Sequence, residues 1–224
     1  GNFFTKNILE LKLGLRVLVE RNIFEYCWSD NQPGYAIVFT VRNEGGGSTF
    51  AEVSDVTFRY NVVRHAGGGL TSFASDDAAI SQLSKRWHIH NNLWYDLSAT
   101  WDSGGNSARW WAFANAAQVP GGVSDFTVDH NTIRHRSPKI RFMDDWNTSA
   151  ITNNLTNAQV TSHAEGIHGN TGEGDATLTA YVPSGTYQGN AQVAGVAGNY
   201  TGHPGNFFPA NEAAVGFENA ANKD

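Results

Sequence analysis

A thirteen-residue phrase that occurs twice is the feature of this chain that most constrains its fold. The segment VSDVTFRYNVVRH occupies residues 53–65, and VSDFTVDHNTIRH occupies residues 123–135. Both begin with Val-Ser-Asp, continue as an alternation of apolar and polar residues, and contain an Asn followed by a second short stretch that ends in Arg-His. Repetition of this kind indicates an architecture in which equivalent units stack on one another.

The repeat extends to further units when the chain is aligned on the Asn. The aligned residues are Asn22, Asn61, Asn92, Asn131 and Asn154, at intervals of 39, 31, 39 and 23 residues, with Asn2 in GNFF as an earlier candidate. Each unit reads as a strand with two inward apolar positions, an Asn at a turn, and another short apolar stretch. The inward positions predicted in the first four units are Val17 and Val19, Val56 and Phe58, Trp87 and Ile89, and Phe126 and Val128.

The spacing of the units narrows the choice of repeat architecture. The intervals are too variable for a propeller, and the units are too rich in strand-forming residues for a helical solenoid. A parallel β-helix accommodates them, because each coil keeps its core-facing residues while loops between strands absorb the differences in length. Stacked Asn side chains are then expected to form a hydrogen-bonded ladder at the turn.

Several of these segments resemble a known group of proteins. VTFRYNVVRHAGGGL, YAIVFTVRNEGG and FTVDHNTI resemble the right-handed parallel β-helix repeats of the pectate-lyase-like superfamily, and more narrowly a group of uncharacterised secreted bacterial members. The resemblance covers most of residues 2–217. It implies an all-β, right-handed parallel β-helix solenoid with loop insertions and about six coils, a secreted or cell-surface location, and a truncated N-terminus at which coils and a cap precede Gly1.

We expect a single domain over residues 1–224, with coils over about 2–160 and an irregular C-terminal part over about 161–224. Loops are predicted at 42–52, 66–77, 98–111 and 117–125, and a short helix at 76–87. Beyond Asn154 strict repetition fades, and one further strand pair is expected there.

Composition excludes several classes of function. The formal charge is −6, and no basic stretch could neutralise a run of phosphates, which argues against nucleic-acid binding. Cys27 is the single cysteine, so no internal disulfide framework exists. No apolar run approaches the roughly 18 residues of a membrane-spanning helix. We therefore expect neither a nucleic-acid nor a membrane partner.

An outward row of ionisable residues is the first candidate site. The residue two before each aligned Asn should face solvent, which gives Glu20, Arg59, His90, Asp129 and Thr152. With coils about 4.8 Å apart, His90 would lie beside Asp129 as an oriented base, and Arg59 beside Glu20 could hold a sugar carboxylate. Outward sheet positions are also charged simply to remain solvated. Glu20 and Asp129 would be about 14 Å apart, whereas a hydrolytic carboxylate pair needs roughly 5–9.5 Å.

Asp144 and Asp145 are candidate catalytic acids by resemblance. Hydrolases of the superfamily use clustered Asp residues on neighbouring coils, and its pectate lyases combine Ca²⁺-binding carboxylates with an Arg base. The remaining hydrolase motifs cannot be placed on this chain, so neither type of catalysis is supported residue by residue. No cofactor is expected, with Ca²⁺ as the alternative that the lyases imply.

The loop TWDSGGNSARWW supplies candidate substrate-binding residues, namely Trp101, Arg109, Trp110 and Trp111. Indole rings offer flat apolar faces on which pyranose rings can stack. The alternative is that these residues form a small satellite core beneath their own loop. The segment HAEGIH (His163, Glu165, His168) has no established zinc spacing and is expected to be a loop, so no metal site is predicted.

Three functions remain open from the sequence. The first is a carbohydrate-active enzyme, of glycoside hydrolase or lyase type, acting on an extracellular polysaccharide; it is favoured by analogy of fold alone. The second is a non-catalytic module that binds glycan or protein, and the third is a structural segment of a larger surface protein. A truncated coil would expose unpaired backbone groups, so we also expect this end to be covered by a loop or to form a homodimer.

Overall fold

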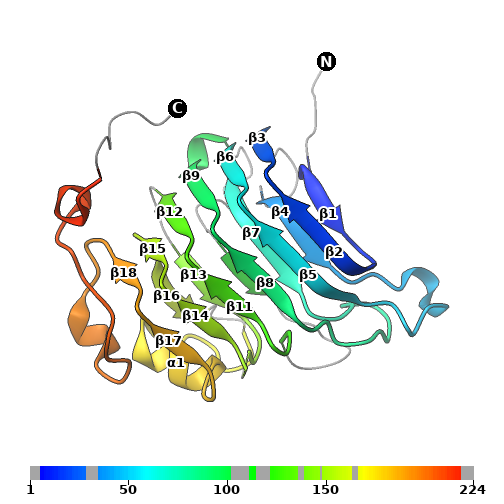
Figure 1. The fold of residues 1–224 in the computed structure, drawn as a ribbon. Coiled ribbons are helices and arrows are strands. Elements are labelled where there is room, and N and C mark those ends of the chain that lie inside the picture. Colours follow the sequence, from blue (N-terminus) through cyan, green and yellow to red (C-terminus); the bar gives the residue numbers. More distant parts are fainter. Residues whose placement is uncertain are drawn as a thin grey trace.

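The computed structural model describes residues 6–28, 35–101, 111–114, 122–135, 139–146, 148–162 and 166–217. For residues 99, 111–114, 135 and 139 the description is limited to the backbone. The strands of this part of the chain form three parallel sheets of six strands each, shown in Figure 1.

The first sheet contains β1 (Leu9–Leu11), β4 (Tyr35–Thr40), β7 (Gly68–Phe73), β10 (Trp111–Ala114), β13 (Lys139–Phe142) and β16 (Gln159–Ser162). The second contains β2 (Gly14–Glu20), β5 (Val53–Arg59), β8 (Trp87–His90), β11 (Thr127–Asp129), β14 (Ala150–Thr152) and β17 (Thr186–Gln188). The third contains β3 (Ile23–Cys27), β6 (Val62–Ala66), β9 (Leu93–Leu97), β12 (Thr132–His135), β15 (Leu155–Thr156) and β18 (Ala191–Gln192).

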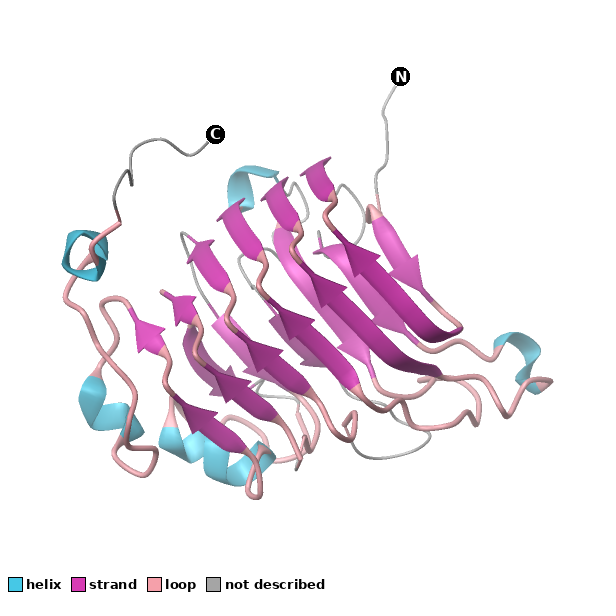
Figure 2. Cartoon of the chain, in the orientation of Figure 1, coloured by secondary structure: helices cyan, strands magenta, loops and turns pink. Residues whose placement is uncertain are grey.

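Each strand pairs with the strand three places later in the chain, so successive triplets of strands stack in register. Val56 of β5, for example, lies between Val17 of β2 and Trp87 of β8. This confirms the predicted stacked parallel strands and is consistent with a parallel β-solenoid. Figure 2 shows that the few helical turns lie at the edges of the stack.

The core lies between the sheets and is built from the predicted inward positions. Val56, Phe58, Trp87 and Ile89 are each 0% exposed, as are Phe126 and Val128 of the next unit. Large rings fill the space between sheets, since Phe39 of the first sheet packs against Trp87 of the second with ring centroids 5.4 Å apart. Alternation along each strand therefore places one face in this core and leaves the other at the surface.

The predicted Asn ladder runs along the turn between the second and third sheets. The Oδ1 of Asn92 accepts the main-chain N–H of Asn61 at 2.9 Å and the side-chain amide of Asn61 at 3.2 Å. The amide of Asn92 in turn donates to the Oδ1 of Asn131 and to the carbonyl of Phe58, both at 2.9 Å. The same pattern continues through Asn154 to Asn190 and Asn206, two members that the sequence did not reveal.

Two local predictions of secondary structure are wrong. Residues 66–77 are not a loop, because they contain β7 of the first sheet. Residues 76–86, all of which the structure describes, contain no helix. The α-helix of the described chain is α1 (Asp175–Tyr181), which packs next to β16. The predicted further strand pair beyond Asn154 includes β17 and β18.

The two ends of the stack differ. At one end α1, η3 (Ala197–Tyr200) and η4 (Glu212–Val215) follow the last strands. At the other end β1, β2 and β3 pair with the stack on one side only, and Leu13, Leu15 and Ile23 are 59%, 51% and 64% exposed. None of the helices described is long and apolar enough to cross a membrane.

Candidate functional site

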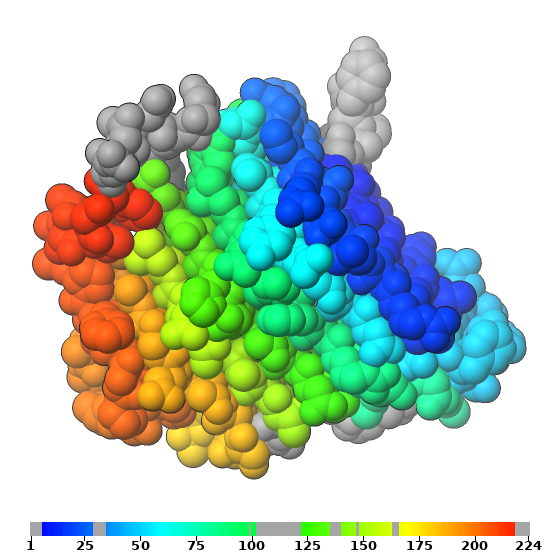
Figure 3. Space-filling model, in the orientation of Figure 1, coloured from blue at the N-terminus to red at the C-terminus, as the bar shows by residue number. Residues whose placement is uncertain are grey.

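The predicted outward row forms a continuous line across the second sheet. Its predicted members pair in register from strand to strand: Glu20, Arg59, His90, Asp129 and Thr152. Gln188 of β17, which the sequence did not reveal, continues the row after Thr152. All of them are at least partly exposed. The face that they occupy is seen in the middle of the space-filling view, over the blue, cyan and green strands (Figure 3). The geometric part of the prediction is therefore confirmed for this row.

Glu20 and Arg59 form a direct ion pair. The Nε and Nη2 atoms of Arg59 both lie 2.8 Å from the Oε2 of Glu20. Arg21, in the turn after β2, approaches the other carboxylate oxygen at 3.9 Å, and its side chain is 75% exposed. The guanidinium groups of Arg21 and Arg59 lie 5.8 Å and 5.7 Å from the centre of the Tyr60 ring. Two cations and one anion thus surround a half-exposed tyrosine.

His90 makes its side-chain hydrogen bond with Asn91 and not with Asp129. The amide nitrogen of Asn91 lies 2.8 Å from Nδ1 of His90 and can only donate, so the ring proton of the neutral imidazole resides on Nε2. The His88 ring stacks on His90 with centroids 3.9 Å apart. Burial, with a contribution from the Arg59 charge, lowers the pKa of both histidines, which keeps them uncharged at neutral pH.

The carboxylate of Asp129 is occupied by hydrogen bonds within the protein. Its Oδ1 accepts from Thr152 at 2.7 Å and from Asn153 at 3.0 Å, and its Oδ2 accepts from Nδ1 of His130 at 2.5 Å. Burial alone would raise the pKa of Asp129, but these donors outweigh it and lower the pKa. Asp129 is therefore ionised at neutral pH and is not a general acid.

The row also lacks a pair of acids at catalytic separation. Glu20 and Asp129 are separated by three strand spacings, which is about 14 Å at the usual distance between strands. Both retaining and inverting hydrolysis need carboxyl groups within roughly 5–9.5 Å of each other. The arrangement can bind a ligand, but it does not reproduce a glycosidase pair.

Asp144 and Asp145 lie elsewhere, directly after β13 of the first sheet. Asp144 is 0% exposed, and its Oδ1 accepts the main-chain N–H of Asp145 at 2.8 Å. The Asp145 carboxylate contacts Nε2 of His168 at 2.6 Å. The structure therefore does not place these two residues in the outward row. His163 and Glu165 lie outside the described residues, and within the described part no group of three His, Cys, Asp or Glu side chains is suited to a metal ion.

The predicted substrate-binding loop is described only at its start. Arg109 and Trp110 lie outside the described residues, and Trp111 begins β10 with only its backbone described. Trp101, in η2 (Ala99–Trp101), is partly exposed, and its Nε1 donates to the Oδ2 of Asp96 at 3.0 Å.

Trp101 belongs to an aromatic cluster that the sequence did not reveal. Its ring centroid lies 5.8 Å from that of Tyr26, 5.9 Å from Trp28 and 5.2 Å from His65. Tyr26 and His65 stack on each other at 4.8 Å. The Nδ1 of His65 lies 2.7 Å from the Oδ2 of Asp96, the oxygen that also accepts from Trp101.

A repeated backbone feature brings this cluster together. Tyr26, His65 and Asp96 each follow a ladder Asn by four residues, and each has a left-handed backbone, with φ of 62°, 52° and 50°. In β3, β6 and β9 the register skips this residue, so its side chain leaves the regular alternation at the same height in three stacked strands. The constant offset of four residues from the Asn is the sequence signal that could have identified it.

A surface pocket of about 640 Å³ lies beside Arg42, Asn43 and Asp76. Asp76 is 2% exposed and accepts the main-chain N–H groups of Asn43 at 2.5 Å and Ala78 at 2.9 Å. Arg42 contacts Asp77 at 2.6 Å. These groups are satisfied by one another, so the pocket is explained by the anchoring of its own loop.

Comparison with known proteins identifies no relative from which a function could be inferred. No protein-family model matches the chain, and no curated protein or solved structure matches it either.

Proposed function

We propose that this chain is a right-handed parallel β-helix of the pectate-lyase-like kind, and that it binds an extracellular polysaccharide on the outward row of its second sheet. A secreted or cell-surface location is part of the proposal, because the ligand is extracellular. The observation that carries it is the surplus of hydrogen-bond donors on this face.

The acceptors on the face are largely used within the protein, whereas several donors face solvent. Glu20 accepts from Arg59, and all of the contacts of Asp129 described above are internal. Among the described residues, the nearest carboxylate oxygen to Arg21 is that of Glu20 at 3.9 Å, and Arg59 uses Nε and Nη2 on the same residue. Guanidinium groups match carboxylate and sulfate groups in shape and charge. The face therefore suits a polymer that carries acidic groups.

Binding is better supported than cleavage. A neutral His90 that carries its proton on Nε2 is a donor, and Asp129 is an ionised acceptor that already accepts three hydrogen bonds within the protein. Hydrolysis or lysis of the polysaccharide, with or without Ca²⁺, is the second candidate. The observation in its favour is that a cation, an imidazole and a carboxylate stand on consecutive strands at Arg59, His90 and Asp129.

Binding is tested by gel retardation in polyacrylamide that contains polygalacturonate, or its methyl-esterified form as the uncharged comparison. Arg21→Gln should weaken retardation by polygalacturonate about tenfold, since a charge-assisted hydrogen bond contributes about 1.5–3 kcal/mol. Arg16→Gln is the matched control, because Arg16 is exposed, lies in β2 five residues before Arg21 and has the same left-handed backbone, with φ of 57° at both residues.

The result that would refute the binding proposal is equal weakening in the two variants, or retardation by neither polymer. Release of reducing or unsaturated ends from polygalacturonate, measured with and without Ca²⁺, would establish the second candidate instead. Its loss in Asp129→Asn but not in Asp144→Asn would then locate the catalytic acid in the row.

The open end of the stack supports a proposal about partners. The unpaired edges of β1, β2 and β3, together with the exposed Leu15 and Ile23, favour association of two copies through this end. Light scattering should give a dimer mass for the native chain and a monomer mass for Ile23→Lys. A monomer mass for both would refute the dimer.

A further inference from the structure

We propose a separate sugar-stacking site where β3, β6 and β9 end, formed by Tyr26, Trp28, Trp101 and His65. Its ligand class is the apolar face of a pyranose ring, so the inference rests on the proposed function in assuming a carbohydrate ligand. The site does not depend on the charged row for its chemistry, because ring stacking does not require an acidic sugar.

The first argument is the exposure of the rings. Tyr26 is 60% exposed and Trp28 is 62% exposed, whereas the core tryptophans Trp87, Trp94 and Trp146 are all 0% exposed. Leaving a large aromatic surface in water forgoes the free energy of burial, about 25 cal/mol per Å² of apolar area. Two rings of the cluster, those of Tyr26 and Trp28, are thus open to solvent.

The second argument is that the cluster is held in place before any ligand arrives. A single carboxylate oxygen of Asp96 accepts from both His65 and Trp101, at 2.7 Å and 3.0 Å. His65 in turn stacks on Tyr26, with an angle of 22° between the two ring planes. Rings fixed in this way lose little conformational freedom on binding, which favours affinity.

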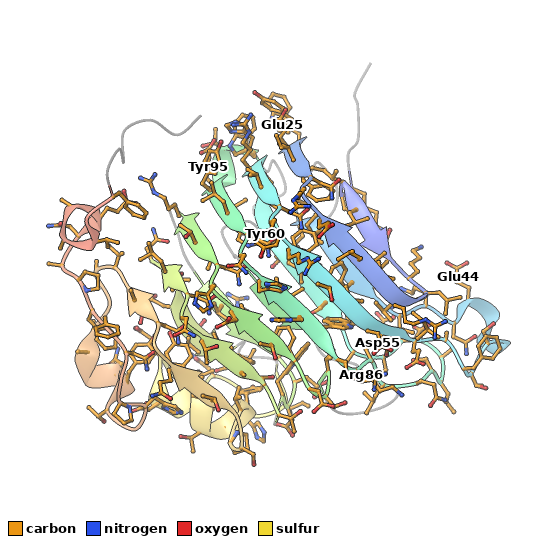
Figure 4. The ribbon with its side chains drawn as sticks, in the orientation of Figure 1. Glu25, Glu44, Asp55, Tyr60, Arg86 and Tyr95 are labelled. Atoms are coloured by element: carbon orange, nitrogen blue, oxygen red, sulfur yellow. The ribbon has the colours of Figure 1, made fainter. Side chains whose placement is uncertain are left out.

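The third argument is that polar groups stand beside the rings. Arg64 donates from Nε to Glu25 at 2.7 Å and also contacts the hydroxyl of Tyr95. Figure 4 shows Glu25 and Tyr95 above Tyr60, and the ring centroid of Tyr95 lies 6.1 Å from that of His65. An apolar platform bordered by a carboxylate, a guanidinium and a hydroxyl matches a sugar, whose ring has an apolar face and a rim of hydroxyl groups.

The test measures gel retardation by polygalacturonate and by its uncharged methyl-esterified form, with three variants. Trp28→Ala removes a ring whose described ring contact is with Trp101, and it should weaken binding of both polymers about two- to tenfold, as expected for one stacking partner. Phe50→Ala is the matched control, since Phe50 is 69% exposed and lies away from these strands in the loop before β5. Tyr26→Phe keeps the ring and should bind as the native chain does.

The outcomes separate this inference from the proposed function. Loss of binding to both polymers in Trp28→Ala but not in Phe50→Ala supports the stacking site. Normal binding by Trp28→Ala overturns it, and if Arg21→Gln is impaired in the same gels the proposed function stands. Impairment in Trp28→Ala with normal Arg21→Gln supports the stacking site and refutes the charged row. Retardation of the native chain by neither polymer overturns both. Near-ultraviolet circular dichroism of each variant verifies its fold.

Discussion

The Asn ladder makes a sharp prediction about stability, because its members are chemically identical but differ in burial. Asn92 is 2% exposed and lies in the interior of the ladder, whereas Asn22 is exposed at its open end. The substitution to compare is Asn→Ala at each position. Asn92→Ala removes the oxygen that accepts two N–H groups of Asn61, one from the main chain and one from the side chain.

The magnitude follows from the groups left without partners. Each buried donor that loses its acceptor costs about 1–3 kcal/mol, so Asn92→Ala should lower the free energy of unfolding by about 2–6 kcal/mol. The carbonyl of Phe58 also loses the donor that reached it at 2.9 Å. Asn22→Ala removes only its bonds to Glu20 and Asn61, and no described residue donates to its Oδ1, so its cost should be about 1 kcal/mol.

Urea unfolding followed by circular dichroism measures both costs. In a separate thermal unfolding experiment the Tm of Asn92→Ala should fall by roughly 5–20 °C, because a loss of 1 kcal/mol in the free energy of unfolding corresponds to about 2–4 °C in a chain of this size. The double variant Asn92→Ala/Asn131→Ala should cost less than the sum of the single variants, since the two residues share a hydrogen bond. Equal costs at Asn92 and Asn22 would refute the reasoning that the ladder stabilises through buried donors.

Three further predictions concern single residues. Burial alone would raise the pKa of Asp175, but hydrogen bonds from the N–H of Gly202 and from the His203 ring outweigh it and lower the pKa below 3.8. The stability that this carboxylate contributes is therefore present above about pH 4 and is lost as the pH falls. Asp175→Asn should reduce the fall in Tm at acidic pH, measured as Tm against pH. Asp76→Ala leaves the buried main-chain N–H of Asn43 unpaired and frees the N–H of the exposed Ala78 to bond with water, so urea unfolding should show a cost of about 1–3 kcal/mol. Gly189 has φ of 71°, and a Cβ there would lie 2.4 Å from the Asn153 side chain, so Gly189→Ala should cost about 1–3 kcal/mol in the same assay.

The fold was predictable wherever the sequence keeps a fixed order around the Asn. The two inward residues of each unit, the outward residue between them and the Asn, and the Asn itself all lie where the alignment put them. The prediction stopped at Asn154 because α1 lies between it and the next unit, and because Gly189 stands before Asn190 where the five aligned units have a larger residue before the Asn. Asn206 belongs to GNFF, the tetrapeptide that also contains Asn2, which lies outside the described residues.

The first sheet was only partly visible in the sequence. Its strand β7 has the sequence GGLTSF, whose two glycines read as a loop although both are buried in a strand, where Gly68 pairs with Tyr35 of β4. Residues 70–73 of β7 pair with both β4 and β10, and this pairing extends the strand through its glycines without local strand propensity.

The candidate sites were predictable to different degrees. The outward row follows from alternation alone, so its geometry could be read directly. The side-chain contacts of its members could not be read in the same way, because Asn91, His130 and Asn153, which lie outside the row, bond to His90 and Asp129. The aromatic cluster was missed because Tyr26 and Trp101 are 75 positions apart and meet only through stacking of the third sheet.

The Asn ladder separates the length of a unit from its spacing in space. Successive ladder residues are 39, 31, 39, 23, 36 and 16 positions apart, yet the bonds between their side chains all measure 2.9–3.2 Å. The number of residues between two ladder residues therefore does not change the spacing of the neighbouring layers. A protein engineer can treat the segment 61–91 as a cassette: duplicating it adds one layer with its own Asn, and the single junction between Asn61 and Asn92 becomes two junctions of the same kind.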